Sequence, residues 1–307
     1  TAAGSGTVTV AAGLAASAAG SATVFPTGNL YIDGLLMGSK WGTTNLTYSF
    51  PTTTSAYAGA NASGAGEESY AFQGLTAQEQ AVMRAVLEGT AATGVTIYGS
   101  YESFTNLNFT LVTGPDSVVG DADIRMAVSG YADPTAYAYY PDGTSWGGDI
   151  WFGASEFATG GPSASTLPGE WGYLTGIHEM GHALGLKHPF DTDYASSGFG
   201  ALPLDRDSLE FTVMSYNSYV GAPANGGYSN EVFGYPTTPM MLDIQALQFL
   251  YGADYTLNAG NTVYSWNPTT GEMSINGVGQ GAPGANRIFM TIWDGGGRDR
   301  YDMSNYT

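Results

Sequence analysis

The chain has 307 residues, 43% of them hydrophobic, so it is long enough to bury a sizeable core in one large domain or two smaller ones. A formal net charge of -19, from 27 acidic and 8 basic residues, argues against nucleic acid or an anionic membrane surface as a partner, since both require a basic patch. The absence of cysteine excludes disulfides, thiolate metal sites and cysteine nucleophiles, and no apolar run is long enough to predict membrane insertion.

The first part of the chain predicts an arm followed by a strand, a loop and a helix. Residues 1–24 are rich in Ala, Gly, Ser and Thr and carry no Lys or Arg, which is typical of a low-complexity arm or pro-region. Residues 46–50 alternate as a strand does, and residues 51–66 form a polar loop. Thr76 to Glu79 is a capping-box pattern, so we expect a helix of about three turns that ends before Gly94.

Four alternating runs follow and predict further strands, at residues 107–112, 124–128, 136–140 and 149–152. We expect them to form a twisted sheet behind a helix that begins near Gly169. Leu174, Ile177, Leu184 and Leu186 would hold that helix against the sheet. The pattern as a whole indicates an α+β fold.

All three histidines of the chain lie in one stretch, at positions 178, 182 and 188. Residues four apart project from the same face of a helix, so His178 and His182 can bind one metal ion. Gly185 can leave the right-handed helical region at little cost, and a turn there can bring His188 back as third ligand. Three protein ligands with one open position are typical of catalytic zinc, whereas structural zinc is closed by four ligands.

Glu179 follows the first histidine and is placed to take a proton from a zinc-bound water. A bare His-Glu-x-x-His also occurs by chance, and lone histidines are usually ordinary core or surface residues. A zinc site that has lost its catalysis is the third interpretation. The complete spacing with Gly185 and His188, and the presence of Glu179, favour a working hydrolytic site.

This stretch resembles the metzincin zinc-peptidase pattern His-Glu-x-x-His-x-x-Gly-x-x-His. That pattern predicts a tight turn with a methionine beneath the metal, and Thr-Val-Met-Ser-Tyr at residues 212–216 is similar to it, with Met214 as the methionine. Pro189 after the third histidine, and Tyr216 after the methionine, resemble the serralysin branch of secreted bacterial zinc proteases. Asn217 departs from the tryptophan of that branch.

The resemblance implies a metzincin domain with a mixed sheet and a long active-site helix. It implies a broad-specificity zinc endopeptidase in which Tyr216 is a fifth zinc ligand that swings to the oxyanion, and Met214 supports the metal from below. By resemblance, residues 136–141 and 147–152 form the upper rim of the cleft, where an edge strand would pair with an extended peptide substrate. We therefore expect a secreted, extracellular monomer, or one associated with the cell surface, acting on protein or peptide substrates.

Towards the C-terminus, residues 239–251 have helical spacing, with Pro239 as a first helical residue and Gly252 as the stop. Asp294 and Asp299 stand among glycines, which fits a calcium site, although such a segment is more often an ordinary turn. The resemblance implies that these two carboxylates and the carbonyl of Gly296 bind calcium, joined by carbonyls of a turn over residues 258–262 (Asn258, Gly260, Thr262).

These observations predict an arm over residues 1–24, a protease domain over 25–255, and a linker with the beginning of a calcium-binding β-roll over 256–307. By resemblance, the β-roll is truncated or absent. The alternative function is a catalytically latent zinc protein of the same fold, or one that binds peptides or a surface layer. A proteinaceous inhibitor, or a pro-segment formed by residues 1–24, would be a further partner.

Overall fold

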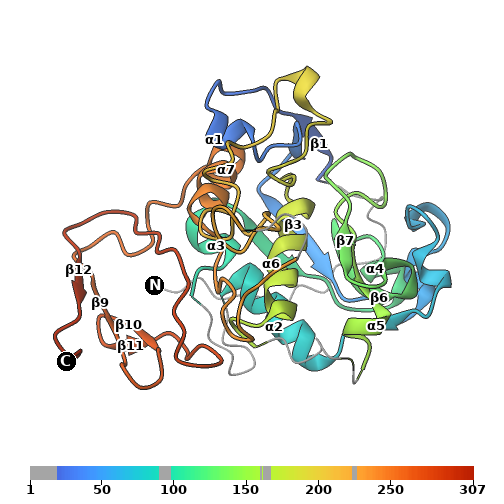
Figure 1. The fold of residues 1–307 in the computed structure, drawn as a ribbon. Helices are drawn as coiled ribbons and strands as arrows, with labels where there is room; N and C mark the ends of the chain where they lie inside the picture. Colours follow the sequence, from blue (N-terminus) through green and yellow to red (C-terminus); the bar gives the residue numbers. More distant parts are fainter. Residues whose placement is uncertain (1–18, 90–97, 160, 162–166, 223–226) are drawn as a thin grey trace.

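The computed structural model describes residues 19–89, 98–159, 161, 167–222 and 227–307. It is a mixed α/β structure with several sheets and few helices (Figure 1). The strands are β1 Ser21–Thr23, β2 Ser39–Trp41, β3 Asn45–Ser49, β4 Gln73–Gly74, β5 Asn108–Leu111, β6 Ile124–Ser129, β7 Ala136–Ala138, β8 Ile150–Gly153, β9 Val263–Trp266, β10 Met273–Ile275, β11 Val278–Gly279 and β12 Arg300–Asp302. The α-helices are α1 Leu30–Asp33, α2 Ala77–Glu88, α3 Tyr101–Phe104, α4 Asp116–Val119, α5 Ala154–Phe157, α6 Trp171–Ala183 and α7 Met241–Tyr251.

A six-stranded mixed sheet carries the order β5-β3-β6-β8-β7, with β4 paired to β6. The four strands β5, β3, β6 and β8 run parallel to one another. Strand β4 is antiparallel to β6, and β7 is antiparallel to β8 and lies at the sheet edge. Strand β6 is buried at every position, as expected for a strand covered on both faces. The helix α6 packs against β7 and β8 on one side and also contacts α2 (Figure 1).

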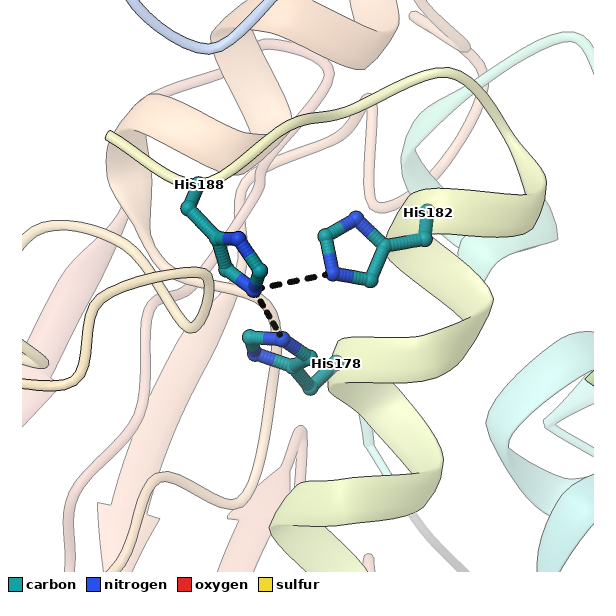
Figure 2. Close-up of side chains that lie close together, drawn as sticks. All are labelled: His178, His182 and His188. Atoms are coloured by element: carbon teal, nitrogen blue, oxygen red, sulfur yellow. Dashed lines mark hydrogen bonds between the residues drawn. The ribbon is translucent and has the colours of Figure 1, made fainter. Parts of the chain in front are cut away.

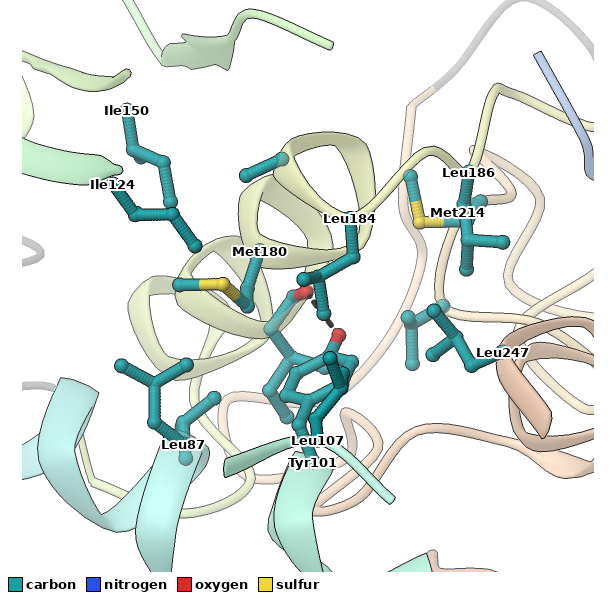
Figure 3. Packing of buried hydrophobic residues seen from close by; sticks show 14 of the residues in the cluster. Leu87, Tyr101, Leu107, Ile124, Ile150, Met180, Leu184, Leu186, Met214 and Leu247 are labelled. Atoms are coloured by element: carbon teal, nitrogen blue, oxygen red, sulfur yellow. Dashed lines mark hydrogen bonds between the residues drawn. The ribbon is translucent and has the colours of Figure 1, made fainter. Parts of the chain in front are cut away.

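The helix α6 lies within the main core, with nearly all of its residues buried. Figure 3 shows side chains from α2 (Leu87), β6 (Ile124), β8 (Ile150) and α7 (Leu247) gathered around this helix. The Tyr101 hydroxyl donates to the carbonyl of Ile177 at 2.7 Å. The three leucines and one isoleucine predicted to anchor the helix, namely Leu174, Ile177, Leu184 and Leu186, are all buried. Burial on all sides fixes the direction in which the helix projects its polar residues.

The C-terminal residues form a separate four-stranded sheet in the order β11-β10-β9-β12. It has its own small cluster of buried side chains, Tyr98, Tyr264, Trp266 and Met273. Phe289 and Trp293 meanwhile pack against the main core. In Figure 1 this sheet lies at the side of the molecule, next to the C-terminus.

Several predicted boundaries differ in detail. The capping box at Thr76 is present, and α2 ends where Gly89 adopts a left-handed conformation (φ 65°). Strand β7 ends at Ala138, short of the predicted Tyr140. Pro239 was predicted as a first helical residue, but Met240 caps α7, so the proline lies just before the cap. The polar loop over residues 51–66 contains two short 3-10 turns, Thr54–Tyr57 and Gly59–Asn61.

Of the predicted arm, only its end can be compared with the structure. Strand β1 pairs antiparallel with β2, and residues 1–18 lie outside the described part of the chain. Among the described helices, none combines the length and the apolar character needed to cross a membrane.

Candidate metal centre and active site

The first two histidines are held by a helix that is buried nearly all round. His178 and His182 lie on α6, and each is 6% exposed. Glycines let neighbouring side chains approach this helix closely, since a Cβ at Gly181 would lie 2.6 Å from the sulfur of Met214. The sequence spacing and the tight packing together fix both imidazoles on one face.

The third histidine reaches the site through a turn at Gly185. This glycine has φ of 103°, and a Cβ there would lie 2.5 Å from the carbonyl oxygen of Ser39. Only glycine satisfies both requirements at this position. The chain then pairs Leu186 with Leu36 in an isolated antiparallel bridge, which directs His188 back over α6.

The three Nε2 atoms converge on one point (Figure 2). The Nε2 of His188 lies 3.3 Å from that of His178 and 3.2 Å from that of His182. Three nitrogens bound to one tetrahedral zinc at about 2.0–2.1 Å would be separated by about 3.4 Å. The arrangement therefore matches the dimensions of a zinc centre.

The contacts of the three Nδ1 atoms explain why the Nε2 lone pairs are available to a metal ion. Nδ1 of His178 lies 2.8 Å from the carbonyl of Val213, and Nδ1 of His182 lies 2.7 Å from that of Leu186. Nδ1 of His188 lies 3.2 Å from a carboxylate oxygen of Asp191. Each acceptor favours the tautomer protonated at Nδ1, so three unprotonated Nε2 atoms face one another, which is the arrangement that binds a metal cation.

The electrostatics agree with neutral imidazoles. Burial lowers the pKa of His178 to about 4, against the opposing effect of its hydrogen bond to Val213. Burial, followed by repulsion from His178 and Lys187, lowers the pKa of His188 to about 3. Neutral imidazoles are the form that binds metal ions.

Glu179 lies beside the triad with an oxygen that has no protein partner. It is 5% exposed, and its Oε2 makes no hydrogen bond. Burial raises the pKa of this carboxyl to about 8, and a divalent cation nearby would lower it again. Glu179, His178 and Tyr216 line one cavity of about 340 Å³, whose other walls are mainly apolar and aromatic (Trp171, Leu174, Tyr228). This cavity can take a substrate side chain beside the metal centre.

Tyr216 lies over the histidines. Its ring centroid is 4.7 Å from that of His188 and 5.8 Å from that of His178, and its side chain is half exposed. Burial, followed by repulsion from Glu179 and Asp191, raises the pKa of its hydroxyl to about 12. The tyrosine hydroxyl therefore stays protonated at neutral pH and can donate a hydrogen bond beside the triad.

The turn that carries Met214 is anchored by a residue that the sequence did not reveal. Asp243 on α7 is fully buried and accepts hydrogen bonds from the Thr212 hydroxyl at 2.5 Å and the Val213 amide at 2.8 Å. Val213 in turn offers its carbonyl to His178. No signal marks Asp243 in the sequence, because it lies about 30 residues beyond the turn.

Two other residues near the triad, Asp191 and Lys187, were not predicted from the sequence. Asp191 could have been suspected, since a carboxylate three residues after a candidate ligand can reach its ring. Lys187 carries no sequence signal: a lysine next to a ligand normally indicates only a charged surface residue. In the structure it is completely buried.

The predicted calcium residues lie close together at the start of the C-terminal sheet. The Thr262 amide donates to Asp299 at 3.0 Å, and the Gly295 amide donates to the carbonyl of Leu257 at 2.8 Å. Asp294 accepts from the Tyr264 hydroxyl at 2.5 Å. The two segments thus meet as expected, with both carboxylates already hydrogen-bonded to the protein. In the part of the chain that is described, the histidine triad is the one group of three or more His, Asp or Glu with metal-binding geometry.

Known proteins resemble a large part of this chain. Serralysin C of Dickeya chrysanthemi is 32% identical over 215 residues, which are 68% of this chain and 42% of that protein. Serralysin of Proteus mirabilis is 36% identical over 177 residues, or 56% of this chain and 33% of the relative. The metallopeptidase AprA of Pseudomonas marginalis is 31% identical over 212 residues, covering 68% and 42%.

No family model matches the chain, and it spans less than half the length of these curated relatives. Several relatives of one kind nevertheless match more than half of the sequence. This similarity and the converging histidine triad agree. Over 56–68% of its length, the chain is thus similar to the serralysin-type metalloproteases.

Proposed function

We propose that the chain is a zinc-dependent endopeptidase that hydrolyses protein substrates. The observation that carries the proposal is the convergence of three neutral Nε2 atoms beside an unpartnered glutamate oxygen in one cavity. His178, His182 and His188 would hold the ion. When bound, zinc would polarise the substrate carbonyl and lower the pKa of water.

The residues of the chain divide the remaining work. Glu179 accepts a proton from the attacking water at Oε2 and returns it to the nitrogen of the leaving amine. Tyr216 would be a further ligand of the zinc before substrate binds, and its hydroxyl would donate to the oxygen on which negative charge develops. Met214 and Gly185 have supporting roles, one packed beneath the triad and one at the turn before His188.

Strand β7 offers a surface for the substrate backbone. It is the edge strand of its sheet and contacts α6, so an extended peptide could add beside it. Main-chain hydrogen bonds along such an edge are independent of side chains, which supports broad specificity.

The remaining parts of the proposal rest on the similarity to serralysins. We infer a metzincin domain with a twisted sheet over residues 25–255, preceded by an arm or pro-segment. Residues 256–307 would begin a calcium-binding β-roll. Secretion, a monomeric state and control by a pro-segment or inhibitor belong to the same proposal.

The decisive variant is Glu179→Gln, which removes the base but keeps the shape of the side chain. We expect one zinc per chain in both proteins and a loss of casein hydrolysis of about 100- to 10,000-fold in the variant. Elemental analysis and a casein assay, with and without a chelator, make the measurement.

Glu102→Gln is a matched control, because Glu102 is another glutamate whose pKa burial raises, here to about 7, and it lies on α3, where it accepts from the Phe109 amide. It should retain full activity. Undiminished hydrolysis by Glu179→Gln would remove Glu179 from the mechanism. One zinc with no hydrolysis by the unmodified chain would instead indicate a latent or binding protein.

A further inference from the structure

Lys187, the residue before the third histidine, is completely buried, with 0% of its surface exposed. Its ammonium donates to four backbone carbonyls: Gly34 at 2.8 Å, Asp191 at 3.1 Å, Gly200 at 3.1 Å and His188 at 3.3 Å. We refer to these four oxygens as the carbonyl cage. The ammonium is positively charged and shares its three protons among these four oxygens. It therefore occupies the carbonyl cage much as a small cation would.

The carbonyl cage begins where the backbone pairing ends. Residues 185–187 are fixed against the segment after α1, since the Lys187 amide donates to Leu35 and the Met37 amide donates to Gly185. Beyond Lys187 the chain leaves this pairing. The ammonium then ties the carbonyls of residues 188, 191 and 200 to Gly34, and so holds the loop that carries His188.

His188 is the ligand that most needs such support. His178 and His182 are fixed by α6, whereas the side chain of His188 lies on a loop and is 20% exposed. Its Nδ1 is held by the carboxylate of Asp191, and the carbonyl of that same Asp191 lies in the carbonyl cage. One ammonium thus fixes both the histidine backbone and the residue that orients its ring.

We propose that Lys187 is a positioning residue for the metal centre: its ammonium acts as an internal cation that sets His188 and Asp191 in ligand geometry before the metal binds. This proposal rests on the zinc site of the proposed function. It differs from a purely structural role, in which the lysine would add stability without affecting metal affinity.

The chain contains only two lysines, Lys40 and Lys187, which provides a matched control. The ammonium of Lys40 donates to the carbonyl of Leu250 on α7 and lies over the ring of Tyr251 on the same helix. Lys187→Met and Lys40→Met therefore each remove an ammonium that donates to backbone carbonyls, four of them at Lys187 and one at Lys40. Only Lys187→Met removes the support of the third ligand.

The first measurement is the zinc dissociation constant, obtained by competition with a chelator of known affinity, beside the unfolding transition without zinc. We expect Lys187→Met to bind zinc about 10- to 100-fold more weakly than the unmodified chain, the effect typical of losing an outer partner of a metal ligand. Lys40→Met should stay within about 2-fold. Equal zinc affinity in the two variants would overturn the proposal, and absence of zinc binding by the unmodified chain would refute the proposed function instead.

A second measurement is made on the unmodified chain and does not require Lys187→Met to fold. Nitrogen-15 NMR of the unmodified chain without metal should show a slowly exchanging ammonium signal for Lys187, identified as the one that persists in Lys40→Met. The signal should change little when zinc is added, because the carbonyl cage is formed beforehand. If the signal appears only with zinc, or not at all, Lys187 does not preset the loop.

Discussion

The histidine centre and the aspartate segments at the start of the C-terminal sheet were both predicted to bind metal ions, and the structure treats their donor atoms differently. In each histidine, Nδ1 lies next to a carbonyl or carboxylate oxygen, and Nε2 points to the common metal position. Asp294 and Asp299, in contrast, accept hydrogen bonds from a tyrosine hydroxyl and a backbone amide.

Burial separates the two regions further. The helix that carries His178 and His182 is enclosed by the main core, whereas Asp299 is exposed and Asp294 only half-buried. A site with free, facing donors on a rigid element is preorganised for its ion. To bind calcium, the two aspartates would have to give up hydrogen bonds to the protein. We therefore expect a modest calcium affinity, and these segments should become more ordered when the ion binds.

The largest expected effect comes from removing one histidine. His182→Gln should weaken zinc binding by more than about 100-fold, beyond the usual effect of losing an outer partner, and should abolish hydrolysis. The matched change at the other region, Asp299→Asn, should leave zinc content and activity unchanged. Zinc per chain and casein hydrolysis are measured for both. If Asp299→Asn also lost zinc, the two regions would be coupled and the contrast would fail.

The next largest effect should come from replacing Asp243, which anchors the turn that carries Met214. Asp243→Ala should lower the free energy of unfolding by roughly 3–5 kcal/mol, because it leaves buried donors without their carboxylate. Asp243→Asn keeps one acceptor and should cost less. Denaturant unfolding measures both. A change below about 1 kcal/mol for Asp243→Ala would mean that α7 and not the carboxylate holds the turn.

The sequence predicted those features that depend on local spacing. The i, i+4 histidines, the turn at Gly185 and the alternating strands all follow from short-range geometry, and the structure places them as expected. Strand ends were less certain, since β7 stops where its pairing partner does and not where alternation stops. Pro239 was misplaced by two residues because the cap of α7, Met240, carries no recognisable capping side chain.

What the sequence could not predict are the long-range polar contacts around the site. Asp243 reaches a turn 30 residues earlier, and the ammonium of Lys187 meets Gly34, 153 residues away. Each looks like an ordinary charged residue until the chain is folded. Their function lies in the tertiary contacts, and no periodicity of the sequence encodes it.

A smaller effect should appear on adding calcium. If the aspartate segments bind it with a dissociation constant of about 0.1–1 mM, 10 mM calcium should stabilise the protein by roughly 1.5–2.7 kcal/mol. Asp299→Asn should lose this increment, whereas Asp302→Asn, on the neighbouring strand β12, should keep it. Thermal unfolding with and without calcium makes the comparison. Equal stabilisation of all three proteins would place calcium elsewhere.

The smallest effect concerns the cost of burying a carboxylate in the region that surrounds α6. Burial raises the pKa of Glu102 in the folded chain to about 7, above its ordinary value near 4.5, and the amide of Phe109 only partly offsets this. A folded state that binds the proton more tightly loses stability as pH rises from about 4.5 to 7.

Glu102→Gln stays neutral and keeps an acceptor for that amide. At pH 5 the two proteins should be equally stable. At pH 8 the variant should be more stable by about 1 kcal/mol, less than the pKa difference alone implies because the side chain is only half-buried. Urea unfolding at the two pH values measures the difference. A variant less stable at pH 8 would show that the ionised carboxylate is well accommodated, and the region around α6 would then tolerate charge more easily than its burial suggests.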